Sequence, residues 1–436
     1  MINLYITTLN INTPNEDNYT NVDDLKTSSI ANNWYRLWGG LDYERANDIT
    51  IDKFGNLYIT GYTYSFGISP YSMFIIKYNA KGMKLWNYTW GTPYKTRGNA
   101  IIADNESHFY VTGVINNTIT GSDNMFLVKF DSNGNELWNF TWGGSNDDEG
   151  NDIVIDGDGY IYVCGITDTF GGNFIAKFDK DKTSIWNATW NFPDQEYAEC
   201  IAIDKDNNIY VAGVLENSTT SYQDLMLVKY SSSNKQLWNF TRWRSNADEW
   251  IDGIAVDQDS NVYITGFIEG PSDDDLALYK YNHTGKELWQ YSWDGGDWDD
   301  VGRDITLDKK GNLYIAGTSY SYAKEDEVLL LKYDCNGRIK DQLIWGGSDD
   351  DRAEGIVINN VSDIFIAGYT RNFGSGFYGQ TLFAKFSGVL GSSKSDNNES
   401  GNDEGNIIYG YDVFLILGSI LGLAIVLIKY RSKNKI

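Results

Sequence analysis

Apolar and polar residues alternate along most of the chain, in short segments that end at turn residues. The first such segments are 46–52, 56–62, 73–79 and 84–90, and a Gly-Asn pair at 55–56 separates the first two. A period of two, bounded by turn residues, is typical of β-strands that bury one face. The pattern therefore predicts four short antiparallel strands in this part of the chain.

The same four-strand pattern recurs along the chain in seven units. Each unit has a strand that ends in glycine, and these glycines lie 48 to 53 residues apart, at Gly61, Gly113, Gly165, Gly213, Gly266, Gly317 and Gly368. A lysine before an aromatic residue, first found at Lys77, and a tryptophan, first found at Trp38, also recur seven times. Repeats of this length with four strands are typical of propeller blades. We predict an all-β fold, a seven-bladed β-propeller of four-stranded antiparallel blades.

The two ends of the repeat array each hold part of one blade. The last unit has strands at 363–369 and 381–387 but lacks a fourth-strand sequence, whereas residues 32–40 supply one with no blade before it. We expect this N-terminal strand to complete the last blade, which would remove open sheet edges. The propeller is then predicted at 33–390, after an N-terminal segment at 1–32.

Bulky aromatic residues fall on one face of each predicted outer strand. In the first unit they are Trp86, Tyr88 and Trp90. A buried face between adjacent blades explains them, and a platform that stacks on sugars is the alternative.

The units at 39–67 and 143–171 closely resemble the SBBP family of β-propeller repeats, known from secreted and surface proteins of bacteria and archaea. The likeness extends over all seven units. It implies the propeller fold and a location at the cell surface. It implies no catalytic residue, because the family has no established catalytic motif.

The C-terminal region has the pattern of a membrane anchor. Residues 413–428 are apolar or small, and a transmembrane helix is predicted at 407–429 after a polar, acidic stalk at 391–406. A basic tail at 430–436 follows directly after Lys429 and is expected on the cytoplasmic side, which places the propeller outside the cell. The region resembles the C-terminal anchors of archaeal surface proteins.

The composition is strongly acidic. Sixty Asp and Glu residues against 35 Lys and Arg give a net charge of −25. Nucleic acid is excluded as a partner, because binding to phosphates requires clustered cations. The three cysteines, Cys164, Cys200 and Cys335, show no spacing of a zinc or redox motif.

Several Asn-x-Ser/Thr sequences are candidate glycosylation sites. Four of them lie in predicted outer strands, opposite the aromatic face, at Asn87, Asn139, Asn187 and Asn239. We expect glycans at these positions to project from the rim of the disc.

Carboxylates cluster in the segments that join one blade to the next. They are predicted to lie on one face of the disc, and the candidate residues for binding a ligand or a cation are Asp147, Asp148, Glu149, Asp248, Glu249, Asp297, Asp299, Asp300, Asp349, Asp350 and Asp351. Three explanations fit such a face: it binds calcium, it binds a cationic partner, or it serves only to keep the protein solvated. No other cofactor is expected.

The predicted function is a membrane-tethered, cell-surface binding or adhesion module for glycans or envelope proteins, without catalytic activity. One alternative is a propeller enzyme, either a carboxylate-dependent glycosidase or a quinoprotein-like oxidoreductase. Another is a purely architectural envelope protein. The similarity of the repeats argues against an enzyme, because catalysis needs a distinctive set of residues in one pocket.

Overall fold

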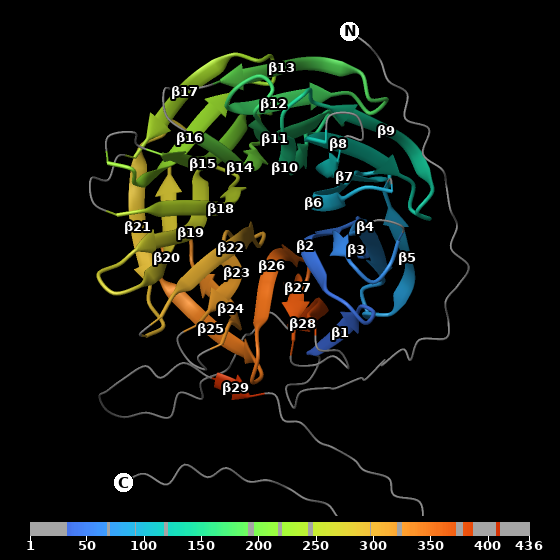
Figure 1. Ribbon diagram of the computed structural model, residues 1–436. Helices are drawn as coiled ribbons and strands as arrows, with labels where there is room; N and C mark the ends of the chain where they lie inside the picture. Colours follow the sequence, from blue (N-terminus) through green and yellow to red (C-terminus); the bar gives the residue numbers. More distant parts are fainter. Residues whose placement is uncertain are drawn as a thin grey trace, which may run out of the picture.

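A computed structural model of the chain describes residues 33–67, 70–91, 93–116, 121–190, 196–216, 220–242, 247–296, 298–320, 325–371 and 378–386, and the backbone of 407–409. In this part of the chain all regular elements are β-strands, which form seven sheets around a central axis (Figure 1). No helix among these residues is long and apolar enough to cross a membrane.

Each sheet is one blade, and its strands follow one another outward from the axis in chain order, except that β1 is the outer strand of blade 7. The first strands, nearest the axis, are β2 (Glu44–Ile51), β6 (Thr96–Ala103), β10 (Asp148–Ile155), β14 (Glu196–Ile203), β18 (Glu249–Val256), β22 (Asp300–Leu307) and β26 (Asp351–Ile358). The second strands are β3 (Leu57–Thr63), β7 (Phe109–Asn116), β11 (Ile161–Thr167), β15 (Ile209–Glu216), β19 (Val262–Glu269), β23 (Leu313–Ser319) and β27 (Ile364–Thr370). Blades 1 to 7 are named by these strands in order.

The outer half of each blade follows the same scheme. The third strands are β4 (Ser72–Tyr78), β8 (Asp123–Phe130), β12 (Asn173–Phe178), β16 (Gln223–Tyr230), β20 (Asp274–Tyr281), β24 (Glu327–Tyr333) and β28 (Gln380–Phe386). The outer strands are β5 (Lys84–Trp90), β9 (Glu136–Trp142), β13 (Ser184–Trp190), β17 (Gln236–Thr241), β21 (Glu287–Trp293), β25 (Ile339–Gly346) and, for blade 7, β1 (Trp34–Trp38). The predicted number of blades and strands per blade is confirmed.

The N-terminal strand closes the ring. β1 pairs antiparallel with β28, in a register that runs from Trp34 opposite Lys385 to Trp38 opposite Thr381. Trp38 is buried and lies 4.7 Å from Phe74 of blade 1, measured between ring centroids. The predicted closure is therefore confirmed, and it joins the two ends of the propeller both by hydrogen bonds and by apolar packing.

The hydrophobic core lies between the blades. Seven clusters of buried residues each combine side chains from two adjacent blades. Between blades 1 and 2, Trp86 lies 5.9 Å from Phe109 and Trp90 lies 4.8 Å from Phe126. The outer-strand aromatic residues are thus packing residues, as predicted.

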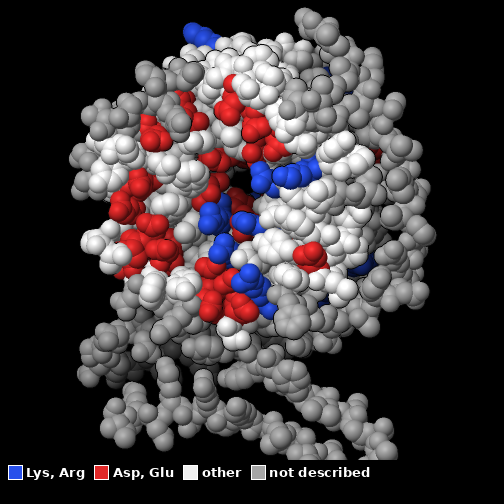
Figure 2. Space-filling view, in the orientation of Figure 1, with Lys and Arg blue, Asp and Glu red and all other residues white. Residues whose placement is uncertain are grey.

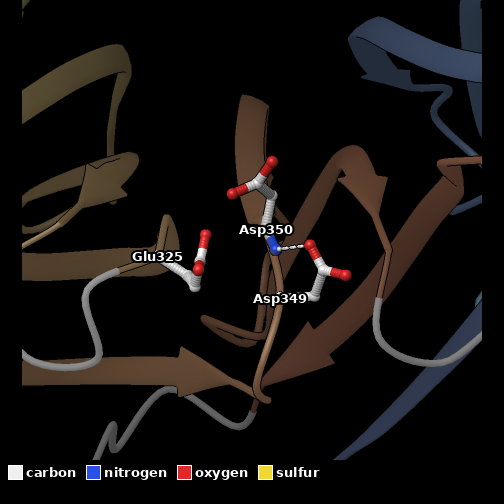
Figure 3. A group of neighbouring side chains, drawn as sticks. All are labelled: Glu325, Asp349 and Asp350. Carbon is white, nitrogen blue, oxygen red and sulfur yellow. Dashed lines mark hydrogen bonds between the residues drawn. The ribbon is translucent and has the colours of Figure 1, made fainter.

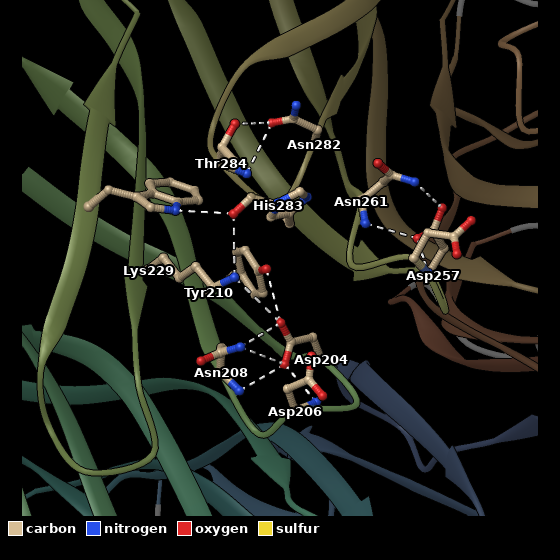
Figure 4. A network of polar contacts seen from close by, with 12 residues as sticks. Asp204, Asp206, Asn208, Tyr210, Lys229, Asp257, Asn261, Asn282, His283 and Thr284 are labelled. Carbon is tan, nitrogen blue, oxygen red and sulfur yellow. Dashed lines mark hydrogen bonds and ion pairs between the residues drawn. The ribbon is translucent and has the colours of Figure 1, made fainter.

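A polar network explains the lysine that recurs in every repeat. In blade 4, Asp204 closes the turn between the first two strands by accepting hydrogen bonds from the Asn208 amide and the Tyr210 hydroxyl, at 2.8 and 3.1 Å (Figure 4). The Lys229 ammonium lies 3.5 Å from Asp204 and donates to the His283 carbonyl of blade 5 at 3.4 Å. The lysine therefore links adjacent blades at the face where these turns lie.

The C-terminal segment touches the propeller at one outer edge. Residues Ile407–Tyr409 form a short strand, β29, parallel to β25 of blade 6 (Figure 1). These three residues fall at the start of the transmembrane helix predicted at 407–429. The rest of the predicted helix, and the predicted segments at 1–32, 391–406 and 430–436, lie outside the described residues.

Candidate functional site

The mouth of the central channel is where the repeats differ most. Two residues of each first strand, the second and the fourth, occupy equivalent positions in the seven blades. The second residues are Arg45, Arg97, Glu149, Tyr197, Trp250, Val301 and Arg352, and the fourth are Asn47, Asn99, Asn151, Glu199, Asp252, Arg303 and Glu354. The first and third positions of the same strands hold buried residues in every blade, so the blades resemble each other in packing and differ around the axis.

Arginines of this region pair with carboxylates of adjacent blades. Arg45 lies 2.8 Å from Glu354, and Arg303 lies 3.2 Å from Asp252. Arg97 pairs with Glu149, and Arg352 pairs with Asp326. Each arginine side chain keeps 28 to 37% of its surface exposed. Basic side chains gather around the central opening, whereas acidic ones lie mainly over the blades formed by β14–β25 (Figure 2).

Tyrosines form a patch beside the arginines of blades 1, 2 and 7. Tyr43, Tyr62, Tyr64 and Tyr71 have ring centroids 5.4 to 6.4 Å from one another along the patch. Tyr64 is exposed, and the other three are half-buried. We call these four tyrosines, together with Arg45, Arg97 and Arg352, the tyrosine–arginine surface.

Strand register places this surface. Tyr62 is directly opposite Arg45 in blade 1, and Tyr369 is directly opposite Arg352 in blade 7. Both arginines lie over the Tyr369 ring, at 5.8 and 5.5 Å from its centroid. Such stacking holds a guanidinium in place while part of it faces solvent.

The channel also holds a carboxyl group with strongly altered acidity. Burial, with the nearby Asp252 and Glu149 carboxylates, raises the pKa of Glu199 to about 8. Asn151 is 3.4 Å from Glu199, and no arginine among the described residues forms an ion pair with it. Glu199 is therefore protonated at neutral pH beside two carboxylates that have arginine partners.

Four of the predicted face residues are buried at the start of first strands. They are Asp148, Glu249, Asp300 and Asp351. Three of these carboxylates accept a hydrogen bond from a glycine amide in the preceding segment: Asp148 from Gly144, Asp300 from Gly295 and Asp351 from Gly347. These three carboxylates fix the segments that connect adjacent blades.

Three of the more accessible predicted residues connect adjacent blades. Asp147 accepts a hydrogen bond from the Asp123 amide, Asp248 from the Gln223 amide and Asp299 from the Asp274 amide, at 2.7 to 3.1 Å. Glu149 lies in the channel mouth, paired with Arg97. Asp297 lies outside the described residues. The predicted acidic group is thus divided among the core, the loops and the channel.

One carboxylate group has a spacing that a metal ion could use. Oxygen atoms of Glu325, Asp349 and Asp350 lie within 4.8 Å of one another (Figure 3). Partial loss of solvent and the neighbouring Asp350 and Asp349 carboxylates raise the pKa of Glu325. The oxygen donors suit calcium, but Arg371 already lies 2.9 Å from Asp350. A calcium ion would therefore compete with a guanidinium at this group.

The predicted glycosylation residues lie away from these sites, on the outer strands β5, β9, β13 and β17. The tyrosine–arginine surface was not predicted from the sequence. The sequence contains one signal that points to it. The second and fourth residues of the first strands differ from blade to blade, whereas the rest of these strands are alike.

Comparison with protein families supports the repeat type. The family model of the SBBP β-propeller repeat matches residues 33–67 and 295–322, which belong to blades 1 and 6 and to the strand that closes blade 7. The family model does not match residues 143–171, the other unit whose sequence resembles the SBBP repeat. A search of curated proteins found no match to this chain.

Solved structures share the fold. A polysaccharide lyase, Uly1, has a TM-score of 0.51 at 9% identity, and the alignment covers 83% of this chain and 94% of the lyase. The periplasmic gluconolactonase PpgL of Pseudomonas aeruginosa has a TM-score of 0.50 at 10% identity, with 70% and 86% of the two chains covered. At these identities the likeness concerns the fold alone. The chain is a seven-bladed β-propeller, and two of its segments match the model of the SBBP repeat.

Proposed function

We propose that the protein is a non-catalytic binding module for glycans and that the tyrosine–arginine surface is its binding site. The observation that carries this proposal is the group of four tyrosines beside three partly exposed arginines at the channel mouth. Tyrosine rings offer flat apolar faces with a polar edge, and guanidinium groups donate hydrogen bonds to hydroxyl or carboxylate oxygens. A sugar ring needs both kinds of contact.

We further propose that the protein acts at the cell surface. The apolar segment at 413–428 and the basic residues that follow it support a membrane anchor with a cytoplasmic end. The β29 strand pairs with the outer edge of blade 6 and precedes the apolar segment in the sequence. This supports an arrangement in which blade 6 is the blade nearest the membrane anchor. Glycans or envelope proteins at the surface are then the accessible partners.

The test is calorimetry with a panel of soluble polysaccharides, with and without calcium. The double variant Tyr62→Ala/Tyr71→Ala should weaken binding by about tenfold or more, equivalent to about 1.4 kcal/mol. Trp298→Ala is the matched control, because Trp298 is an exposed aromatic residue of another blade that packs on Tyr320. Equal losses in both variants, or binding only to envelope proteins, would contradict the proposal.

A glycosidase is the second candidate, and Glu199 is the observation in its favour. Hydrolysis of a glycosidic bond uses one protonated and one ionised carboxyl group, and Glu199 is protonated beside Asp252 and Glu149. Release of reducing sugar that disappears in Glu199→Gln would support this function. Binding without product release would support the first one.

A further inference from the structure

Four asparagines occupy one equivalent position in the outer strands of blades 1 to 4. Strand register pairs Asn87 with Ile76, Asn139 with Val128, Asn187 with Ala176 and Asn239 with Val228. The residue paired in each case is the one before the recurring lysine. The four sites are therefore related by the blade repeat and line the same edge of the disc.

These asparagines are accessible, and most of their side chains form no hydrogen bond with the described residues. Asn87, Asn187 and Asn239 are exposed, and their side chains form no hydrogen bond with the described residues. Asn139 is half-buried, and its amide donates to Glu136 of the same strand at 2.6 Å. Asparagines that support the fold behave differently: Asn282 accepts from Thr284 and Lys286 amides to close a turn.

A threonine follows each asparagine by two positions, at Thr89, Thr141, Thr189 and Thr241. Residues two apart in a strand project from the same face, so each hydroxyl lies beside its asparagine. Thr141 and Thr189 are exposed, and the other two are half-buried. The opposite face of each strand carries the aromatic residues that pack between blades.

The equivalent position in blades 5 to 7 has a different role. Gln290 of blade 5 accepts a hydrogen bond from Arg242, and Gln342 of blade 6 accepts one from Trp293 at 3.2 Å. Tyr35 of blade 7 lies opposite Ala384 and packs on Trp345 of blade 6, with ring centroids 5.5 Å apart. These side chains tie neighbouring blades together, and β29 covers the edge of blade 6.

We infer that Asn87, Asn139, Asn187 and Asn239 are N-glycosylated and that their glycans form a belt over the edges of blades 1 to 4. Each asparagine nitrogen forms a bond to the anomeric carbon of a lipid-phosphate-linked oligosaccharide. The bond from that carbon to the phosphate oxygen breaks, the lipid phosphate leaves, and the amide loses one proton. The inference rests on the proposed surface location, because the lipid-linked donor is used outside the cytoplasm.

The belt would protect the outer strands. β5, β9, β13 and β17 present unpaired backbone groups, which can pair with strands of another molecule. Bulky glycans at the middle of each strand would block such pairing. The edges of blades 5 to 7 would stay free of glycan, on the side where β29 returns to the propeller.

Glycopeptide mass spectrometry of the full-length protein from membranes of its own cells tests the inference. We expect glycan at the four belt positions and none at Asn282. The variant Gln290→Asn creates a new sequon with Ser292, which is exposed, and should gain one glycan. Unmodified belt asparagines, or a Gln290→Asn variant without added glycan, would overturn the inference.

Protease treatment of intact cells separates this outcome from the proposed location. Cleavage of the propeller from intact cells, together with unmodified belt positions, would overturn the glycan belt and leave the proposed function standing. A propeller that is protected in intact cells and cut only after lysis would overturn the surface location, and the belt with it.

Discussion

At the scale of single residues, carboxylates join the blades where the first strands bulge. The Asp152 side chain accepts hydrogen bonds from its neighbour Ile153 and from Ile201 of the next blade, at 2.7 and 2.8 Å. Asp48 and Asp304 make the same pair of contacts in blades 1 and 6. Such residues tie adjacent blades at the channel wall.

We predict that Asp152→Ala lowers the free energy of unfolding by about 1–3 kcal/mol for each amide left without an acceptor. Urea unfolding followed by tryptophan fluorescence measures the change. Asp158→Ala is the control, because Asp158 is exposed on a turn of the same blade. A loss no larger than that of the control would show that the bulge contact contributes nothing.

Single residues also show why the structure places consecutive acidic residues in different surroundings. Asp147, Asp148 and Glu149 are consecutive in the sequence, and this predicts one cluster of carboxylates. Side chains in a strand alternate between faces, so Asp148 is buried while Glu149 reaches the channel, and Asp147 lies in the loop before the strand. The alternation was visible in the pattern, but where the strand begins was not.

At the scale of elements, β1 carries the closure of the ring. It supplies the outer strand of blade 7 and places Trp34 5.0 Å from Phe383, between ring centroids, as well as Trp38 against Phe74. Without β1, the edge of β28 would be exposed, and the cluster between blades 7 and 1 would lose both indoles.

We predict that a chain starting at residue 39 is much less stable than one starting at residue 33. Removing a buried tryptophan side chain alone costs about 3–5 kcal/mol, and the strand hydrogen bonds are lost as well. Differential scanning calorimetry and size-exclusion chromatography measure melting temperature and association. Similar melting temperatures for the two chains would contradict the closure role of β1.

Elements were the best predicted feature of the fold. The predicted strands 46–52, 56–62, 73–79 and 84–90 correspond to β2–β5, because alternation and glycine turns are local properties. The tyrosine–arginine surface depends on pairing between strands. Tyr62 and Tyr369 look like ordinary strand residues until the register places Arg45 and Arg352 opposite them.

At the scale of the whole molecule, buried carboxyl groups set the response to pH. Burial, with the Asp351 and Asp326 carboxylates, raises the pKa of Glu327 to about 8 from an ordinary value of 4.5, and Glu199 also reaches about 8. The folded protein therefore keeps protons that the unfolded chain has released between those values. Stability falls as pH rises through this window.

We predict a higher melting temperature at pH 5 than at pH 8, measured by scanning calorimetry at constant ionic strength. Protonation of carboxylates at pH 5 also reduces the repulsion within a chain of net charge −25, and this raises the melting temperature as well. The variant Glu199→Gln/Glu327→Gln should be more stable than the wild type at pH 8, with a flatter pH profile. A wild-type melting temperature that rises toward pH 8 would refute this assignment of the two protons.

The whole molecule also separates its two faces by chemistry. One face carries the turn networks of the Asp204 type, which are the same in kind from blade to blade, and the other carries the channel mouth, where the blades differ. Repetition on one face and divergence on the other support the proposal that the protein makes specific contacts at the channel mouth.

Hydrogen–deuterium exchange with the polysaccharide that binds in calorimetry tests this claim most directly. We predict reduced exchange at Tyr62–Tyr64, at 70–73 and at 94–98, which bear or adjoin the tyrosine–arginine surface, and unchanged exchange in the turns around Asp204 and Asp257. Reduced exchange in those turns, or along the outer strands alone, would contradict a binding site at the channel mouth.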